Sequence, residues 1–218
     1  MIELRDVCKT YHARSGPVDV LAGVNLRVEK GDKIGIVGRN GAGKSTLIRL
    51  ISGIERQSSG TIERQMRISW PLAFTGAFQG ALTGVDNIRF ICRIYNKRYE
   101  DVIDFVEDFS QLGRFLHEPM KIYSSGMRAR LAFAVSLMID FDCYLIDEVV
   151  AVGDARFQAR SHEELFVRRK DRAMILVSHD IHYMREHCES ACVLADGQLH
   201  HFSSADDALQ FHQEMMAA

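Results

Sequence analysis

Short apolar runs and amphipathic stretches alternate along the chain and predict its elements. In the first third, apolar residues alternate around Ile2-Glu3-Leu4, recur over 18–28 and fill the run at 33–37, which predicts strands. A helix is expected over 44–52, because its apolar positions recur at helical spacing and Gly53 is a residue type that often follows a helix.

The rest of the chain predicts helices that alternate with strands. The expected elements are helices over 102–109 and about 125–140, strands over 144–146 and 174–177, a hairpin at Asp196-Gly197 and a short helix from about Ser204. Polar residues directly follow both of the apolar strands. This pattern suits a parallel sheet whose functional groups lie at the carboxyl ends of its strands.

Composition and charge exclude several classes of protein. The chain has 218 residues, of which 47% are apolar and 26% charged, so wholesale disorder is excluded. Lys plus Arg total 27 against 29 for Asp plus Glu, a net charge of −2, which argues against a globally basic nucleic-acid-binding protein. The longest nearly apolar run, 131–139, is about half of the roughly 20 residues that a membrane span needs.

The start of the chain and its cysteines indicate the cytosol. The first residues, MIELRDVCKTYH, contain no apolar h-region, so we expect no signal peptide. The five cysteines are odd in number and form no Cys-x-x-Cys pair, which indicates free thiols. A metal site at Cys188 and Cys192 is the weaker alternative, because zinc favours four ligands.

One segment matches a phosphate-binding loop. The pattern G-x-x-x-x-G-K-[ST] is met by Gly38, Arg39, Asn40, Gly41, Ala42, Gly43, Lys44 and Ser45, with Thr46 next. The segment follows an apolar strand and opens a helix, which is the context that this loop requires. Glycines let backbone N–H groups surround an anion, Lys44 would reach the β and γ phosphates, and Ser45 would ligate Mg²⁺. A glycine-rich turn with an accidental lysine is the alternative.

Polar groups at two other strand ends fit the same chemistry. An apolar strand ends in the adjacent acids Asp147 and Glu148, of which Asp147 would hold Mg²⁺ and Glu148 would polarise an attacking water. His179 lies just past the strand at 174–177. The ordinary alternative for such a histidine is a hydrogen-bonded residue of the core or surface.

Together these residues resemble the nucleotide-binding subunit of ABC transporters, over essentially the whole chain. The most diagnostic element is Tyr123-Ser124-Ser125-Gly126-Met127-Arg128, with 19 residues between it and Glu148. The family places its signature motif, usually LSGGQ, at this position.

The resemblance implies a head-to-tail homodimer that holds two ATP molecules. Each ATP would lie between the phosphate loop of one copy and the signature segment of the other, where Ser124 and the next two residues face the γ-phosphate. Glu148 would be the general base and His179 the γ-phosphate sensor. Asp154 occupies the position of the D-loop aspartate. Tyr11 matches the aromatic residue that stacks on adenine, with an aromatic at a strand end as the alternative.

The chain departs from the family pattern in two places. Ser125 and Met127 replace the usual second glycine and glutamine of the signature, although Ser125 still offers a backbone amide. The glutamine that ligates Mg²⁺ in the family would fall near Phe74 or Thr75, and Gln79 is the nearest glutamine. Either the loop is remodelled with Gln79 as a ligand, or this subgroup lacks that ligand.

Within the family, segments 69–84, 123–130 and 147–154 look like the ATPases of polysaccharide exporters, closest to group 2 capsular polysaccharide export, including polysialic acid export. This resemblance implies an ATP- and Mg²⁺-dependent exporter subunit, peripheral at the cytoplasmic face of the inner membrane. Its expected partners are a second copy of the chain, a dimer of integral-membrane permease subunits and, indirectly, periplasmic and outer-membrane export components, without nucleic acid.

Alternatives stay open at this point. Related O-antigen exporter ATPases often append a carbohydrate-binding domain, and this chain ends after the core, which favours the capsule type over an O-antigen or teichoic acid exporter. A soluble ABC ATPase acting on nucleic acid or ribosomes is a further alternative. The apolar segment from Trp70 to Phe78 is either a strand packed on the core or a groove for a coupling helix of the permease.

The implied fold is α/β: a P-loop NTPase (RecA-like) ABC ATPase core with an antiparallel β layer and an inserted α-helical subdomain. Residues 1–218 would form one ABC ATPase domain, with the core at 1–79 and 136–218 and the helical signature subdomain at about 80–135.

Overall fold

The computed structural model describes residues 1–14, 16–72, 76, 78–147, 153–178 and 181–217. Its contacts divide the chain into two compact units. The first unit comprises Met1–Pro71, Phe141–Glu148 and Arg169–Ala218, and the second comprises Leu72–Asp140 and Val149–Arg168. These units are groups of mutually contacting residues, and the domain boundaries expected from the sequence stay a prediction.

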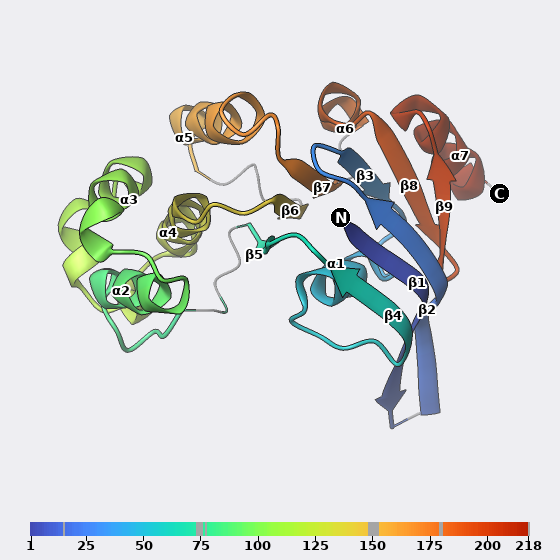
Figure 1. The fold of residues 1–218 in the computed structure, drawn as a ribbon, viewed down its shortest axis with the longest axis horizontal. Helices are drawn as coiled ribbons and strands as arrows, with labels where there is room; N and C mark the ends of the chain where they lie inside the picture. Colours follow the sequence, from blue (N-terminus) through green and yellow to red (C-terminus); the bar gives the residue numbers. More distant parts are fainter. Residues whose placement is uncertain (15, 73–75, 77, 148–152, 179–180, 218) are drawn as a thin grey trace. The chain divides into compact units, whose positions relative to one another are not determined.

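Two β-sheets lie in the first unit (Figure 1). The larger sheet has the order β5 (Ile68–Pro71), β6 (Cys143–Asp147), β7 (Ala173–Val177), β3 (Lys33–Val37), β8 (Ser190–Ala195) and β9 (Gln198–Phe202). Its strands pair in parallel, except that β9 returns antiparallel to β8. The smaller sheet is antiparallel, in the order β2 (Gly16–Val28), β1 (Ile2–Ala13) and β4 (Ser59–Arg64). The mixed α/β class and the antiparallel layer predicted from the sequence are confirmed.

Buried strands of the parallel sheet share one apolar core with the smaller sheet. Every residue of β7 is buried, as the nearly continuous apolar run predicts for an inner parallel strand. Ile2, Leu4 and Val7 of β1 belong to the same buried cluster as Ile34 and Ile36 of β3. β1 is longer than its alternation indicates, because shifts of register interrupt the pattern of its apolar positions.

Helices of the first unit form at 44–52 and near Ser204, as the sequence predicts, whereas the helix that precedes β8 was not predicted. The helix α1 (Lys44–Ser52) buries its apolar positions and ends at Gly53, whose φ of 79° needs a residue without a Cβ. This confirms the prediction for 44–52. The helix α6 (Ile181–His187) precedes β8, and α7 (Ala205–Ala217) follows β9 near the expected Ser204. The predicted hairpin also forms, with positive φ at both Asp196 and Gly197.

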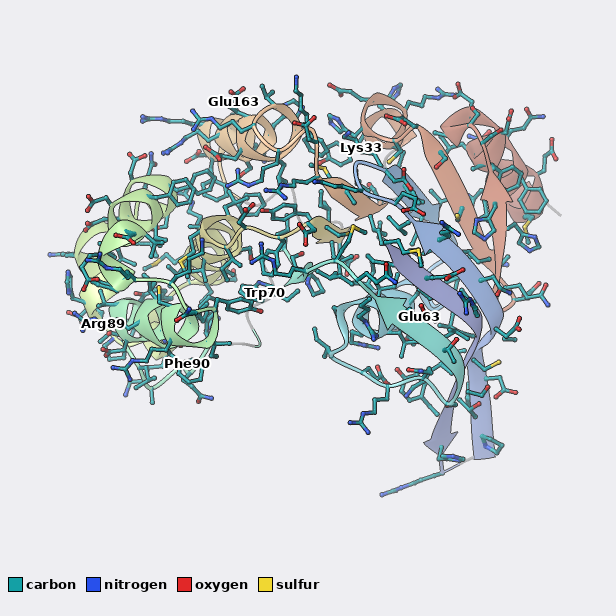
Figure 2. All side chains as sticks on the ribbon, viewed as in Figure 1. Lys33, Glu63, Trp70, Arg89, Phe90 and Glu163 are labelled. Carbon is teal, nitrogen blue, oxygen red and sulfur yellow. The ribbon has the colours of Figure 1, made fainter. Side chains whose placement is uncertain are left out.

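Trp70 packs within the first unit. Trp70 is labelled in Figure 2. Its ring lies edge-on to that of Phe141, with 5.5 Å between the ring centroids. Pro71, the next residue of β5, is buried. The strand interpretation of this segment therefore holds at its start. Phe74 and Thr75, where the family's glutamine would fall, lie outside the described residues.

The second unit is helical. It contains α2 (Gly84–Ile94), α3 (Ile103–Ser110), α4 (Ser125–Met138), α5 (Ala155–His162) and a π-helical turn at Glu163–Val167 (Figure 1). Short 3₁₀ turns lie at Tyr99–Asp101, Gly113–His117 and Met120–Ile122. The predictions for 102–109 and for the start at Ser125 are confirmed. The second of these helices ends at Met138 rather than Asp140, because Ile139 has an extended backbone.

Aromatic rings bring three of these helices together. Phe109 of α3 stacks on Phe133 of α4 with 5.8 Å between centroids, and Phe157 of α5 meets Phe109 edge-on at 5.2 Å. These pairs give the second unit a core of its own. Within the described part of the chain, none of the helices has the length and apolar character that crossing a membrane requires.

Candidate functional site

The phosphate loop lies in the first unit, between the buried strand β3 and the helix α1. Gly41 and Gly43 have φ angles of 84° and 105°, in the left-handed region. A Cβ added to Gly43 would lie 2.8 Å from Cγ1 of Val20, and one added to Gly38 would lie 2.5 Å from the carbonyl oxygen of Leu194. The loop thus requires glycine for both conformation and space. The N-cap residue of α1, Gly43, makes no side-chain cap, so the first N–H groups of this helix are suited to bind an anion.

Lys44 points back into the loop. Its Nζ donates hydrogen bonds to the carbonyl oxygens of Gly38 at 2.7 Å and Arg39 at 3.1 Å. The ammonium group is therefore held where the loop would receive phosphates. Charged phosphate oxygens make stronger bonds to an ammonium than neutral carbonyls do, so a bound triphosphate would replace these acceptors. Ser45 is exposed and Thr46 is buried, so Ser45 carries the hydroxyl that meets solvent.

Tyr11 is fixed beside the phosphate loop by a charged network. Its hydroxyl donates to Oε2 of Glu55 at 2.8 Å and lies 3.5 Å from Oγ1 of Thr46. Lys9 and Arg49 make ion pairs with Glu55 at 2.9 and 3.2 Å. Burial alone would raise the pKa of Glu55, but hydrogen bonds from Lys9 and Tyr11 and the charge of Arg49 outweigh it and lower the pKa. Sequence reasoning found Tyr11 but not Glu55.

Asp147 lies at the same sheet edge as the phosphate loop. It ends β6 in register with Val177 at the end of β7, and β7 is the parallel neighbour of β3, from which the loop emerges. Ser45 and Asp147 both offer the oxygen ligands that Mg²⁺ prefers, so these residues fit a magnesium–nucleotide complex. Glu148 and His179, the predicted base and γ-phosphate sensor, lie outside the described residues.

A cavity of about 670 Å³ adjoins the phosphate loop. Its walls are Arg39, Asn40, Gly41 and Ala42 of the loop, residues 18–20 of β2, residues 193–197 of the hairpin and His212 and Met215 of α7. This volume falls in the range of small-molecule sites, roughly 300–1,000 Å³. Burial and the charge of Lys44 lower the pKa of His212, so this imidazole tends to be neutral.

The signature segment lies in the second unit, at the start of α4. Ser124 is the N-cap residue, and its Oγ accepts a hydrogen bond from the N–H of Met127 at 3.2 Å. Ser124, Ser125 and Gly126 are exposed, whereas Tyr123 is buried and donates through its hydroxyl to the carbonyl oxygen of Phe115. The segment therefore presents the end of a capped helix to solvent.

Asp154 lies beside the signature segment. Its Oδ1 accepts from the N–H of Phe157 at 2.9 Å, which caps α5, and its Oδ2 pairs with Arg130 of α4 at 2.8 Å. The hydrogen bond from Phe157 and the Arg130 guanidinium hold the pKa of Asp154 below its usual range. Ser124, Gly126, Arg130 and Asp154 line one cavity of about 370 Å³. Sequence reasoning did not find Arg130, although it lies within the 123–130 segment used for the resemblance.

Gln79 is exposed, in a turn before α2. Its backbone N–H donates to Oδ1 of Asn87 at 2.8 Å, and Nδ2 of Asn87 donates back to the Gln79 carbonyl at 3.1 Å. These bonds fix the Gln79 backbone and leave its side chain outside the packed region. Its role as a metal ligand stays a prediction.

Comparison with known proteins gives a consistent result. The family model described as "ABC transporter" matches residues 21–151. ATP-binding protein BexA of Haemophilus influenzae is 59% identical, over 98% of this chain and 99% of that protein. Capsule polysaccharide export ATP-binding protein CtrD of Neisseria meningitidis serogroup B is 57% identical over 99% and 100% of the two chains. Polysialic acid transport ATP-binding protein KpsT of Escherichia coli is 40% identical over 99% of each.

Solved structures confirm the fold. The ATP binding subunit of an ABC transporter superposes with a TM-score of 0.81 at 23% identity, covering 97% of this chain and 93% of that one. A dimeric ATP-binding cassette in a post-hydrolysis state, bound to ADP and Pi, superposes with a TM-score of 0.77 at 21% identity, covering 91% and 96%. At such identities these likenesses establish the P-loop cassette fold and nothing further.

Proposed function

Because the chain belongs to the ABC transporter family and is an ATPase subunit of it, we propose that it drives export of capsular polysaccharide across the bacterial inner membrane. The observation that carries this proposal is the similarity to the meningococcal capsule export protein over nearly the full length of both chains. The similarity to polysialic acid transport proteins supports the same cargo class. O-antigen and teichoic acid exporters are the alternative cargo classes, and their ATPases are less similar, at 33–36% identity.

ATP would bind along the first unit. The loop amides and Lys44 would hold its phosphates, and Tyr11, fixed by Glu55, would stack on its adenine. A bound Mg²⁺ would neutralise phosphate charge, with Ser45 and Asp147 as its protein ligands and Gln79 as a weaker candidate. Glu148 would take the proton of the attacking water.

A second copy of the chain would complete each site. Ser124 and the next two residues are exposed at the capped start of α4, where their amides and the Ser124 hydroxyl are suited to the γ-phosphate. ATP would then join two surfaces, and its hydrolysis would release them. His179 would contact the γ-phosphate from the first unit. Dimeric cassettes among the similar structures support this arrangement.

Export requires a membrane partner, which we propose to be a dimer of integral-membrane permease subunits. The chain would be held peripherally at the cytoplasmic face through this permease. Periplasmic and outer-membrane capsule export components would act with it indirectly, and no nucleic acid is involved. The export-system names of the relatives support this placement.

Co-purification tests the proposal. The chain is tagged in its own organism, membranes are solubilised in mild detergent, and the proteins that accompany it are identified against an untagged strain. A multi-span permease together with envelope export components would support capsule export. A permease without them would favour another exporter class. Recovery only in the soluble fraction, with ribosomes or nucleic acid, would overturn the proposal.

A further inference from the structure

Arg130 connects the signature helix to the residue that starts α5. Its Nη2 lies 2.8 Å from Oδ2 of Asp154, and its guanidinium lies over the ring of Phe157, 5.3 Å from the ring centroid. Only 21% of the Arg130 side chain is exposed, against 63% for Asp154. The arginine is thus the anchored partner, and Asp154 is held at the surface by it.

Asp154 uses its two oxygens for different purposes. Oδ1 accepts from the Phe157 N–H and caps α5, whereas Oδ2 accepts from Arg130. The cap fixes the carboxylate relative to α5, and the ion pair fixes it relative to α4. Asp154 therefore links the start of α5 to the helix that Ser124 opens, in addition to the ring contact between Phe133 and Phe157.

The cavity of about 370 Å³ shows what this connection shapes. Its lining includes Ser124, Gly126 and Met127 of the signature segment, Arg130, and Gly153 and Asp154 at the start of α5, together with Gln111, Leu112 and Phe115. If Arg130 released Asp154, the rings of Phe133 and Phe157 would still hold α4 against α5, but the carboxylate would no longer be fixed relative to the signature residues.

A contribution to the stability of the fold does not explain the ion pair between Arg130 and Asp154. Ion pairs near the surface contribute little to stability, because solvent screens them and two long side chains lose freedom. Arg160 and Asp108 make a similar pair in the same unit, at 2.6 Å, with the Arg160 guanidinium 4.9 Å from the Phe109 centroid. That pair joins α3 and α5 and lines a different cavity, which contains no signature residue. It is a matched control for an ion pair of the same kind.

We propose that Arg130 is a positioning residue, which holds Asp154 against the signature segment so that both meet the nucleotide of a second copy as one surface. The inference rests on the proposed ATP-dependent dimer. Arg130 itself need not touch the nucleotide. A misplacement of about 1 Å in such a surface can cost about 100-fold in rate.

The test compares Arg130→Met, Arg130→Lys, Asp154→Asn, the double variant Arg130→Met/Asp154→Asn and the control Arg160→Met in the full chain with its permease. Asp154→Asn keeps an oxygen for the Phe157 cap and removes the charge that Arg130 binds. Steady-state hydrolysis gives kcat and KM, and a fluorescent ATP analogue reports binding to the isolated chain. ATP-dependent dimerisation is measured by light scattering with Glu148→Gln added to each variant.

We expect Arg130→Met and Asp154→Asn each to lower kcat by about 10- to 100-fold and to weaken ATP-dependent dimerisation. Binding of the analogue should change less than about twofold, and the melting temperature by less than about 4 °C. The double variant should be no slower than the slower single variant, because both changes break one contact. Arg130→Lys should recover part of kcat, and Arg160→Met should match the unaltered chain.

Three results would overturn the inference. The first is a kcat within twofold of the unaltered chain for both Arg130→Met and Asp154→Asn. The second is an equal loss of kcat in Arg160→Met. The third is a loss of kcat in the double variant that equals the product of the fold-losses in the two single variants. If the unaltered chain neither hydrolyses ATP nor dimerises with it, the proposed function fails first, which separates that failure from this one.

Discussion

The glycines of the phosphate loop allow a paired test of its geometry. Gly41 and Gly43 both have positive φ, but only Gly43 is also crowded, with 2.8 Å from an added Cβ to Val20 Cγ1 and 3.2 Å to the Val20 carbonyl oxygen. Around Gly41, no heavy atom of the described residues, apart from Gly41 and its chain neighbours, lies within 4 Å of an added Cβ. Gly41→Ala should therefore lower the free energy of unfolding only by the cost of placing alanine in the left-handed conformation, about 1–2 kcal/mol. Gly43→Ala should add a packing conflict of about 1–3 kcal/mol to the same backbone cost.

Urea unfolding of the full chain measures the free energy of unfolding of both variants and of the unaltered chain. The expected free energies of unfolding fall by about 1–2 kcal/mol for Gly41→Ala and about 2–5 kcal/mol for Gly43→Ala, with unchanged dependence on urea. Gly43→Ala should also lose ATP binding, because relief of the conflict would move the N-cap of α1. Equal losses in the two variants, or a larger loss for Gly41→Ala, would refute the geometry described for the loop.

Further predictions concern catalysis, acid stability and thiol reactivity. Glu148→Gln should lower ATP hydrolysis tenfold or more while ATP binding is kept, and unchanged turnover would remove Glu148 from the role of base. Because the pKa of Glu55 is lowered in the folded chain, its carboxylate stabilises the fold at pH values above its ordinary pKa of 4.5. This stabilisation is lost as the pH falls through the folded pKa, so the unfolding curves of the unaltered chain and Glu55→Gln should converge in acid. A constant difference between them down to pH 3 would contradict this. At pH 8 only Cys8 should react quickly with a thiol reagent, since the other four cysteines are buried, and a fast phase that survives Cys8→Ser would contradict the packing.

Sequence reasoning succeeded where a local pattern determines the structure. The helix at 44–52, its end at Gly53, the strand at 33–37 and the hairpin at Asp196-Gly197 all depend on periodicity or turn chemistry within a few residues. The phosphate loop is a motif of the same local kind. These elements could be read from the chain without knowledge of its packing.

Elements whose buried face is polar were not predicted. The helix α5 and the π-helical turn after it bury Phe157, Ser161, Glu164 and Leu165, which recur at helical spacing. Two of these four residues are polar, so the apolar periodicity that would have indicated the helix is incomplete.

Contacts between residues that are far apart along the chain also could not be predicted from the sequence. Arg130 and Asp154 are 24 residues apart, and Tyr11 and Glu55 are 44 apart. Their pairing depends on how helices and strands pack, which no spacing along the chain reveals. The candidate site could thus be predicted for the residues that a motif names, and not for those that hold them in place.

The central claim is that this ATPase drives polysaccharide export, and the surface glycan measures it most directly. The gene is deleted in its own organism, and the strain is complemented with the unaltered chain or with Lys44→Ala at equal expression. We predict that deletion removes capsular polysaccharide from the surface and leaves it in the cytoplasm, and that only the unaltered chain restores the surface polysaccharide. Unchanged surface polysaccharide after deletion, or full restoration by Lys44→Ala, would contradict the account.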